Sequence, residues 1–273
     1  MTDNALARRL AEDASRSLEP IFELLAGIAE DVLRIRPPRA ALTEAHFGGL
    51  QRRLADLPQE ERAVWGMGFI AAPFVVDGKE RYLAWWQRND DRVARLRLNF
   101  DPGSVDVYDY IQMDWYQLAQ RGQRRVAYGP YVDYSGSDMY TITATIPIVA
   151  DGVFLGVAGA GLVVGGGEGH PPGAPDDQTD ADLAWLVGEV ERHLLEALRQ
   201  TGDDAVVVNT ERRVIAANTA RWFVGSRLPA MPVVGPSADA FAFREVAEMP
   251  LGTGWVLAIA WQDADEQRRG GDA

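Results

Sequence analysis

The sequence contains no cysteine, a single lysine (Lys79) and only three histidines among its 273 residues. The lack of cysteine excludes disulfides, thiolate zinc sites and cysteine nucleophiles. His46, His170 and His193 have no partner at the spacing of metal ligands, and the sequence has no Gly-x-Ser-x-Gly elbow. We therefore expect no metal, no cofactor and no catalytic residues. The alternative is an enzyme that uses only carboxylates, which would leave no such motif.

The chain also lacks a large basic surface and a long apolar run. Its formal net charge of −13 argues against binding to nucleic acid, because phosphate backbones are bound by basic patches. The best basic cluster, Arg121, Arg124 and Arg125, is interpreted as a solvated turn. No segment reaches the roughly 18 to 20 apolar residues of a membrane span, and residues 1–18 carry too many charges for a signal peptide. These features predict a cytoplasmic protein without membrane contact.

What is present is an ordinary globular composition, with 47% hydrophobic and 25% charged residues. Helical and strand-like patterns follow one another in separate blocks, which predicts an α+β fold and not a parallel βαβ sheet. The predicted organisation is an N-terminal helical region (1–60), a larger strand-rich lobe (61–178), a linker helix (179–202), a smaller strand-rich lobe (203–262) and a polar tail (263–273).

The N-terminal region has apolar residues at helical spacing over residues 4–35. Pro20 lies inside this pattern and is expected to break or kink the helix near Leu18. A second helix is expected over residues 43–57, with Thr43 as its N-cap. The first helix either covers a sheet or forms a homodimer, and the pattern does not choose between the two.

The larger lobe shows short strand patterns separated by turn residues, which predict an antiparallel sheet. Asp151-Gly152 predicts a tight hairpin. The period-two alternation of residues 141–148 predicts a strand with one face toward something polar. The glycine-rich residues 165–178 are interpreted as a linker and not as a phosphate cradle. The expected strands are 65–70, 81–87, 92–99, 124–128, 140–149 and 153–164, with a helix over 107–121.

The smaller lobe follows a helix that Thr179 is expected to cap and that reaches about residue 201. Four strand patterns come after it, which predicts a second, smaller antiparallel sheet. These strands are expected at 205–209, 213–217, 242–248 and 254–261.

A set of spaced aromatic, glycine and proline residues between positions 108 and 162 resembles the Cache sensor family, and most closely its double Cache members. The resemblance implies a long N-terminal helix, a ligand-binding lobe, a second PAS-like lobe and a sensing role. The matching residues are Tyr108, Trp115-Tyr116, Gly129-Pro130-Tyr131-Val132-Asp133, Thr141 to Ala144, Pro147-Ile148 and Gly152 to Gly159.

The same residues suggest a site for a small cation. Tyr108 and Trp115 are seven positions apart and would share one face of the expected helix, with Tyr116 beside them. Tyr131 and Asp133 are two positions apart in an extended segment, so their side chains would lie on the same side. Aromatic rings that face a carboxylate bind cations. The alternative is that the rings are core residues and Asp133 caps a turn beside Gly136.

Two departures from the family pattern restrict the ligand. Met113 stands where amino-acid-binding members carry an arginine that clamps the ligand carboxylate, and Gly161 stands where an acidic residue is usual. The predicted ligand is therefore an amine without a carboxylate, or a quaternary ammonium compound. Lactate- or pyruvate-type carboxylates and atypical amino acids remain alternatives. Trp85 and Trp86 point to opposite faces of their strand, so one is expected to line the cavity; we choose Trp85.

The predicted ligand site therefore consists of Trp85, Tyr108, Met113, Trp115, Tyr116, Tyr131 and Asp133. Because the chain carries no recognisable effector domain, we expect it to pass its ligand state to a separate protein, such as a transcriptional regulator. A binding or storage protein without a signalling role is the alternative.

Overall fold

The computed structural model describes residues 4–37, 41–56, 64–89, 92–105, 107–133, 140–163, 189–234, 243–250 and 252–261. They form two units. The larger contains the described residues between 19 and 163, and the smaller contains residues 4–18 with those from 189 onward. The predictions for residues 165–178, Thr179, Gly136 and the tail 263–273 lie outside the described residues. No helix in the described part of the chain is long and apolar enough to span a membrane.

The first helix, α1 (Ala5–Ile35), is continuous. Of the two outcomes expected at Pro20, a break or a kink, the break is wrong, because the helix runs through this residue. Proline removes one intrahelical hydrogen bond, but Pro20 is exposed, so its ring meets solvent and not a packed neighbour. Leu18 and Phe22, on either side of it, are buried and hold the helix to the protein. The buried stripe is Ala7, Leu10, Ala14 and Leu18 in the smaller unit and Phe22, Leu25, Ile28 and Val32 in the larger.

The core of the larger unit is an antiparallel sheet in the order β3-β2-β1-β6-β5-β4. Its strands lie where the sequence predicts them, with ends that differ by a few residues. The bounds are β1 (Val64–Ala71), β2 (Leu83–Asn89), β3 (Arg92–Arg95), β4 (Val126–Val132), β5 (Tyr140–Ala150) and β6 (Val153–Val163). Asp151 and Gly152 have φ of 52° and 77°, which confirms the predicted hairpin between β5 and β6.

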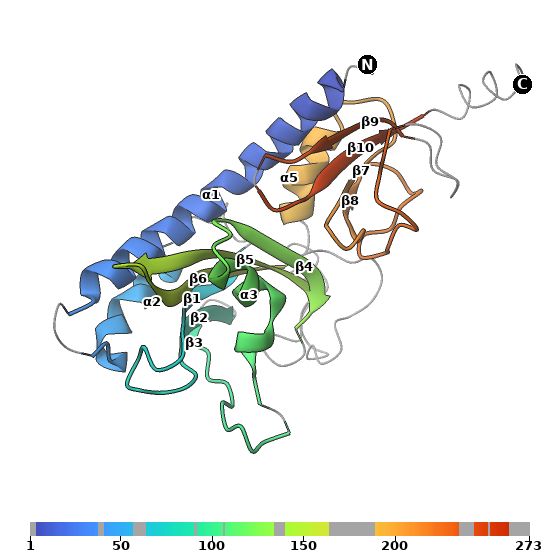
Figure 1. The fold of residues 1–273 in the computed structure, drawn as a ribbon. Helices are drawn as coiled ribbons and strands as arrows, with labels where there is room; N and C mark the ends of the chain where they lie inside the picture. The colour runs from blue at the N-terminus through green and yellow to red at the C-terminus, as the bar shows by residue number, and fades with distance from the viewer. Residues whose placement is uncertain are drawn as a thin grey trace, which may run out of the picture. The chain divides into compact units, whose positions relative to one another are not determined.

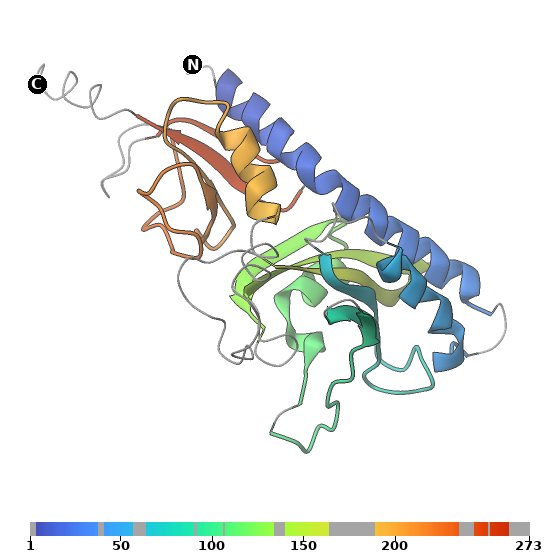
Figure 2. The ribbon, with the colours of Figure 1, turned by 180° about the vertical axis from the view of Figure 1, so that it is seen from behind.

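Helices cover both faces of this sheet (Figures 1 and 2). The C-terminal part of α1 and α2 (Leu50–Ala55) lie on one face, and α3 (Asp114–Gln120) lies on the other. Before α2, residues 44–49 form a 3-10 helix, η1 (Glu44–Gly49), in place of the first half of the predicted helix. There His46 Nδ1 accepts a hydrogen bond of 3.0 Å from the Thr43 backbone N–H.

The predicted helix over residues 107–121 is only partly present. A short 3-10 helix, η3 (Tyr110–Gln112), is followed by Met113 with an extended backbone (φ −74°, ψ 138°), and α3 begins at Asp114. Tyr108 therefore lies outside any helix, two residues before η3, and the prediction that it shares a helix face with Trp115 is wrong. Buried Tyr110 anchors the irregular stretch, because its hydroxyl donates to the Ala71 carbonyl (2.7 Å) and accepts from the Tyr82 N–H (3.0 Å).

The smaller unit has a four-stranded antiparallel sheet in the order β8-β7-β10-β9. Its elements are α5 (Glu189–Leu198), β7 (Ala205–Val208), β8 (Val214–Ala217), β9 (Phe243–Glu248) and β10 (Val256–Ala260). Asn218 joins helix to sheet, since its amide donates to the Leu198 and Asp203 carbonyls and its oxygen accepts from the Ala205 N–H. Two antiparallel sheets with surrounding helices confirm the predicted α+β class.

Candidate functional site

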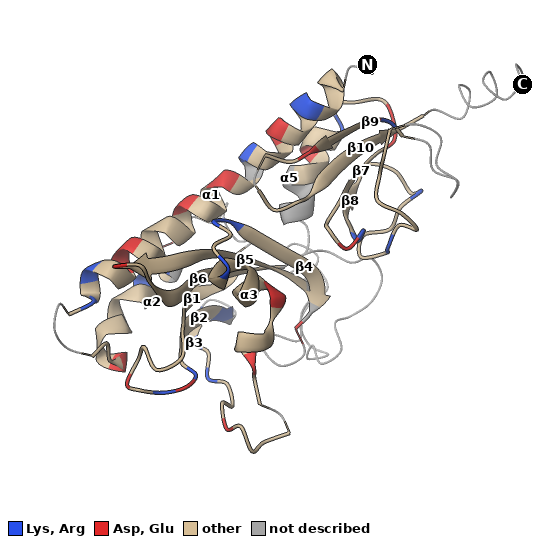
Figure 3. Ribbon diagram, in the orientation of Figure 1, with Lys and Arg blue, Asp and Glu red and all other residues tan. Residues whose placement is uncertain are grey.

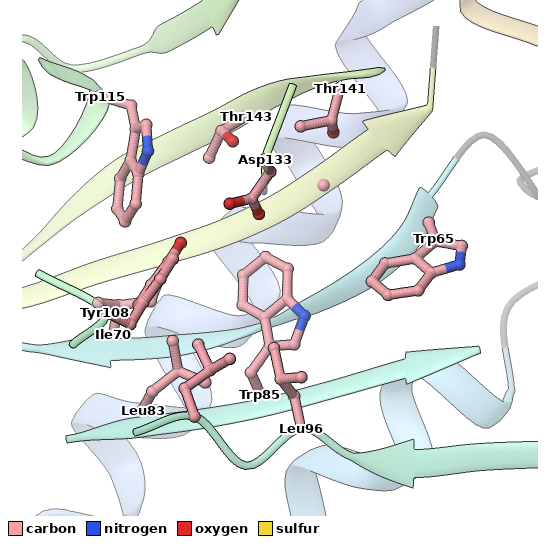
Figure 4. Close-up of a pocket in the computed structure, with 12 residues that line it drawn as sticks. Trp65, Ile70, Leu83, Trp85, Leu96, Tyr108, Trp115, Asp133, Thr141 and Thr143 are labelled. Carbon is pink, nitrogen blue, oxygen red and sulfur yellow. The ribbon is translucent and has the colours of Figure 1, made fainter. Parts of the chain in front are cut away.

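A small cavity of about 40 Å³ lies between the larger sheet and the segments that cover its α3 face. Five of its lining residues belong to one buried apolar cluster of this unit: Ile70, Leu83, Trp85, Tyr108 and Trp115. Figure 4 shows its lining residues, which come from β1, β2, β5, β6, α3 and the segments before α3 and after β4. They are Trp65, Ile70, Leu83, Trp85, Leu96, Leu98, Tyr108, Trp115, Asp133, Thr141, Thr143 and Gly161.

Aromatic rings form much of the cavity wall. Tyr108, Trp115 and Trp85 have exposed fractions of 7%, 2% and 8%, so their rings contact protein or the cavity and little solvent. Trp115 lies in the first turn of α3, and its backbone carbonyl accepts a hydrogen bond from Thr145 Oγ1 (3.2 Å), which ties α3 to β5. Trp65, from the start of β1, faces Trp85 across the cavity (Figure 4).

Two threonines of β5 supply hydroxyl groups to the cavity. Side chains two apart on a strand share a face, so Thr141 and Thr143 both point to the cavity while Ile142 points to the other side of the sheet. Thr141 Oγ1 donates to the Leu162 carbonyl (2.9 Å), and Thr143 Oγ1 lies 2.7 Å from the Tyr131 hydroxyl. Both hydroxyl oxygens can still accept a hydrogen bond from a ligand.

Asp133 brings a carboxylate to the aromatic wall. Its side chain is half-buried and points between Trp115 and Trp85, with the Tyr108 hydroxyl directed toward it (Figure 4). Burial raises the pKa of Tyr108 well above its usual value, and the charge of Asp133 raises it further. The pKa of Tyr131 is raised by the same two causes in the same order. The two phenols therefore stay neutral beside the carboxylate of Asp133.

The indole nitrogen of Trp115 lies on the side of its ring that faces Thr143 and Asp133 (Figure 4). Among the described residues it has no hydrogen-bond partner of normal geometry, although it lies close enough to the Tyr131 hydroxyl to lower the pKa of that group.

The structure brings four of the seven predicted site residues together at the cavity: Trp85, Tyr108, Trp115 and Asp133. Trp85 and Trp86 do point to opposite faces, and Trp86 stacks instead on the Arg95 guanidinium, 4.6 Å from its ring centre.

The other three predicted residues do not line the cavity. Tyr131 is not a lining residue, but its hydroxyl lies beside the lining residues Thr143, Trp115 and Asp133. Tyr116 is fully buried against Tyr110 and Phe154, because consecutive helical residues point about 100° apart. Met113 packs on the edge of the apolar cluster.

Sequence reasoning missed several lining residues. The alternation of residues 141–148, which predicts a polar-facing strand, is the signal by which Thr141 and Thr143 can be found. Trp65 and the pair Leu96 and Leu98 had no distinguishing signal, since their approach to the cavity depends on the order of strands in the sheet.

Gly161 lines the cavity, and there is room for a side-chain atom at this position. A Cβ atom there would lie 3.6 Å from the Trp85 ring and 3.8 Å from Thr141 Oγ1, which are ordinary contacts. Glycine therefore leaves space in the cavity. The described lining residues contain one carboxylate and no arginine or lysine, and no cluster of three or more possible metal ligands occurs in the described part of the chain.

Residues 50–164 match the family model described as "Methyl-accepting chemotaxis protein-like, first PDC sensor domain". A search of curated protein sequences found no significant match.

Solved structures share the fold. The ligand-binding domain of the Pseudomonas aeruginosa PAO1 chemoreceptor PctB in complex with L-Arg has 14% identity and a TM-score of 0.53, with 96% of this chain and 94% of that chain covered. The ligand-binding domain of the Pseudomonas fluorescens chemoreceptor CtaA in complex with L-serine has 13% identity and a TM-score of 0.56, with 96% of each chain covered. The extracellular domain of a protein assigned as a histidine kinase, mmHK1S-Z3, has 14% identity and a TM-score of 0.59, covering 98% and 96%.

These findings confirm the predicted family resemblance. Residues 50–164 match the model of a PDC sensor domain, and the chain has the double Cache fold, with a long N-terminal helix, a larger lobe and a smaller lobe.

Proposed function

We propose that this chain is a small-molecule sensor whose larger lobe binds an amine or a quaternary ammonium ion. The observation that carries the proposal is the single carboxylate of Asp133 in a cavity walled by Trp65, Trp85, Tyr108 and Trp115. Each ring that faces a desolvated cation contributes about 0.5 to 2 kcal/mol. A charge-assisted hydrogen bond from an ammonium to Asp133 contributes roughly 1.5 to 3 kcal/mol more.

The size of the cavity favours a small ligand. At about 40 Å³ it is well below the 300 to 1,000 Å³ range typical of pockets for drug-sized molecules. It suits a small ammonium ion whose substituents are short. A hydroxyl on one such substituent would find hydrogen-bonding groups in Thr141 and Thr143, which line the cavity.

The second candidate ligand is an amino acid, because PctB and CtaA were solved with L-Arg and L-serine. The charges at the cavity argue against it. The described lining residues offer no cation for a carboxylate, and Met113, at the position of the expected arginine, is a thioether outside the lining. The same argument applies to lactate and pyruvate.

Isothermal titration of the purified chain with ethanolamine, choline, trimethylamine, L-serine and lactate tests the proposal. We expect heat of binding from at least one of ethanolamine, choline and trimethylamine, and none from L-serine or lactate. Binding of lactate or L-serine with no binding of any amine would refute it.

The role of a pure sensor, with no turnover, is part of the proposal. Incubation of the chain with the amine that binds best, followed by NMR of the small molecule, should show it unchanged. Appearance of a product would identify an enzyme that uses the carboxylate of this cavity.

Cytoplasmic location, a downstream protein and a homodimer through α1 stay predictions from the sequence. Cell fractionation tests the first. If the chain forms a ligand-dependent homodimer, the amine should change its sedimentation coefficient. If it acts on a downstream protein, the amine should change its affinity for that regulator. No change in either the sedimentation coefficient or the affinity would favour a binding protein without signalling.

A further inference from the structure

A second concave site lies in the larger unit, on a surface that the ligand cavity does not use. This groove has a volume of about 650 Å³ and is bordered by α1, by the turn between α3 and β4, and by the β5–β6 hairpin. Its lining residues are Phe22, Ala26, Ala119, Gln120, Gly122, Arg124, Arg125, Ile146, Pro147, Val149, Gly152 and Phe154. It shares no residue with the cavity around Asp133.

The floor and the hairpin side of the groove are apolar. Phe22 and Ala119 are buried, Ile146 and Phe154 are half-buried, and Val149 is 49% exposed. The strands β5 and β6 carry no charged residue (Figure 3). An apolar chain or ring laid along this floor would remove exposed apolar surface from water, which is worth about 25 cal/mol per Å².

The opposite rim carries two arginines in different electrostatic states. Arg125 is paired with Glu19, with N–O distances of 2.7 and 2.5 Å, and its guanidinium stacks on Phe22. The hydrogen bond from Arg125 lowers the pKa of Glu19, as expected of a stable ion pair. Arg125 is therefore neutralised and forms part of the wall.

Arg124 is exposed at the rim and makes no ion pair or hydrogen bond with any described residue. Gln120 also lines the groove, and its amide is a further donor. Arg124 is thus a cation without a partner at the edge of an apolar groove, although the chain has a net charge of −13. This arrangement favours a ligand with an anionic head group and an apolar body.

We propose that this groove is a second ligand site that takes an amphipathic monoanion, an aliphatic or aromatic carboxylate. The carboxylate lies at Arg124 and Gln120, and the apolar body lies over Phe22, Ile146 and Phe154. Arg124 gives the site its preference for anions, and the groove volume of about 650 Å³ accommodates the apolar body.

Isothermal titration with octanoate tests this assignment. Acetate probes the carboxylate head group alone, and 1-octanol probes the apolar chain alone. Octanoate should bind, and acetate and 1-octanol should bind at least about tenfold more weakly. Arg124→Gln should weaken octanoate about tenfold or more, because one charge-assisted hydrogen bond is lost. Arg121→Gln is the matched control: it removes the same charge from the same turn, outside the groove lining, and should leave the affinity unchanged.

Two further variants test the location. Ala26→Trp adds bulk from an exposed position of α1 and should abolish octanoate binding with an unchanged thermal unfolding midpoint. If that variant does not fold, Val149→Asp, on the exposed hairpin, replaces it and should also abolish binding. Asp133→Asn should leave octanoate binding intact. The proposal is overturned if octanoate does not bind, or if 1-octanol binds equally well. It is also overturned if octanoate binds unchanged to the Ala26→Trp and Val149→Asp variants, or if the Asp133→Asn variant no longer binds octanoate.

Discussion

Asp133 is the residue on which cation recognition depends. Asp133→Asn keeps the size of the side chain and removes its charge, so affinity for the best amine should fall by roughly 10- to 150-fold, the equivalent of about 1.5 to 3 kcal/mol. Titration calorimetry measures this change. Asp151→Asn is the control, because Asp151 lies in the exposed β5–β6 hairpin and pairs with Arg36. Equal affinities of the two variants would mean that the amine is held elsewhere.

Gly161 is the residue that sets the width of the cavity. In Gly161→Ala the new methyl group makes only ordinary contacts, so the unfolding free energy should change by less than about 0.5 kcal/mol. The methyl group occupies ligand space, however, and trimethylamine should lose about tenfold in affinity while methylamine loses less.

Gly68→Ala provides the contrast, since a Cβ there would lie 2.0 Å from the Ala84 carbonyl oxygen and should destabilise the sheet by about 1 to 3 kcal/mol. Chemical denaturation separates the two variants. A Gly161→Ala variant that binds both amines as wild type would place the ligand away from β6.

At the level of secondary structure, Pro20 is the clearest departure from local sequence rules. The helix continues through it because buried residues on both sides hold α1 in place, so the proline weakens a helix that packing maintains. Pro20→Ala should therefore raise the free energy of unfolding by about 1 to 3 kcal/mol. Thermal and urea unfolding followed by circular dichroism measure this. Ala26→Gly, also exposed on α1, should lower stability by about 0.5 to 1 kcal/mol. A lower unfolding midpoint for Pro20→Ala would mean that the ring makes a contact that stabilises the fold.

The strands were predictable from sequence because their signals are local. Alternation in residues 141–148 and the Asp151-Gly152 turn both lie within one hairpin, and the hairpin forms as expected. The start of the helix expected over residues 107–121 was not predictable from local sequence. Tyr110 forms hydrogen bonds with Ala71 and Tyr82, which lie about 30 to 40 positions away in sequence. The same limit applies to the site. Trp115 and Asp133 could be chosen from their local pattern, whereas Trp65 and Leu96 reach the cavity only through the order of strands.

For the whole molecule, buried tyrosines predict a loss of stability at alkaline pH. Burial raises the pKa of Tyr108, and it raises the pKa of Tyr110 to about 12. A group whose pKa is higher in the folded state stabilises the fold below its unfolded pKa, near 10, and this contribution is lost as pH rises through the folded pKa. Urea unfolding between pH 8 and about pH 12 should show falling stability above pH 10, by up to about 1.4 kcal/mol per pH unit for each such tyrosine.

Tyr108→Phe removes one of these groups and should flatten the decline. The free energy of unfolding of this variant at pH 8 measures the cost of losing the contacts of the Tyr108 hydroxyl, and the decline is measured relative to that value. An equally steep decline in this variant would show that Tyr108 titrates normally in the folded protein.

Ligand binding should stabilise one unit of the molecule and not the other, because every residue of the cavity belongs to the larger unit, whose apolar cluster is separate from that of the smaller. At an amine concentration 100 times the Kd, the ligand-bound state gains about 2.7 kcal/mol over states that cannot bind. Hydrogen exchange measured by mass spectrometry should then slow by up to about 100-fold in peptides from β1, β2, α3, β5 and β6. Peptides from β7, β8 and β10 should exchange at their original rates, and Asp133→Asn should abolish the difference. Equal protection of both sets of peptides would require coupling between the two cores, and protection of the smaller unit alone would place the amine site there.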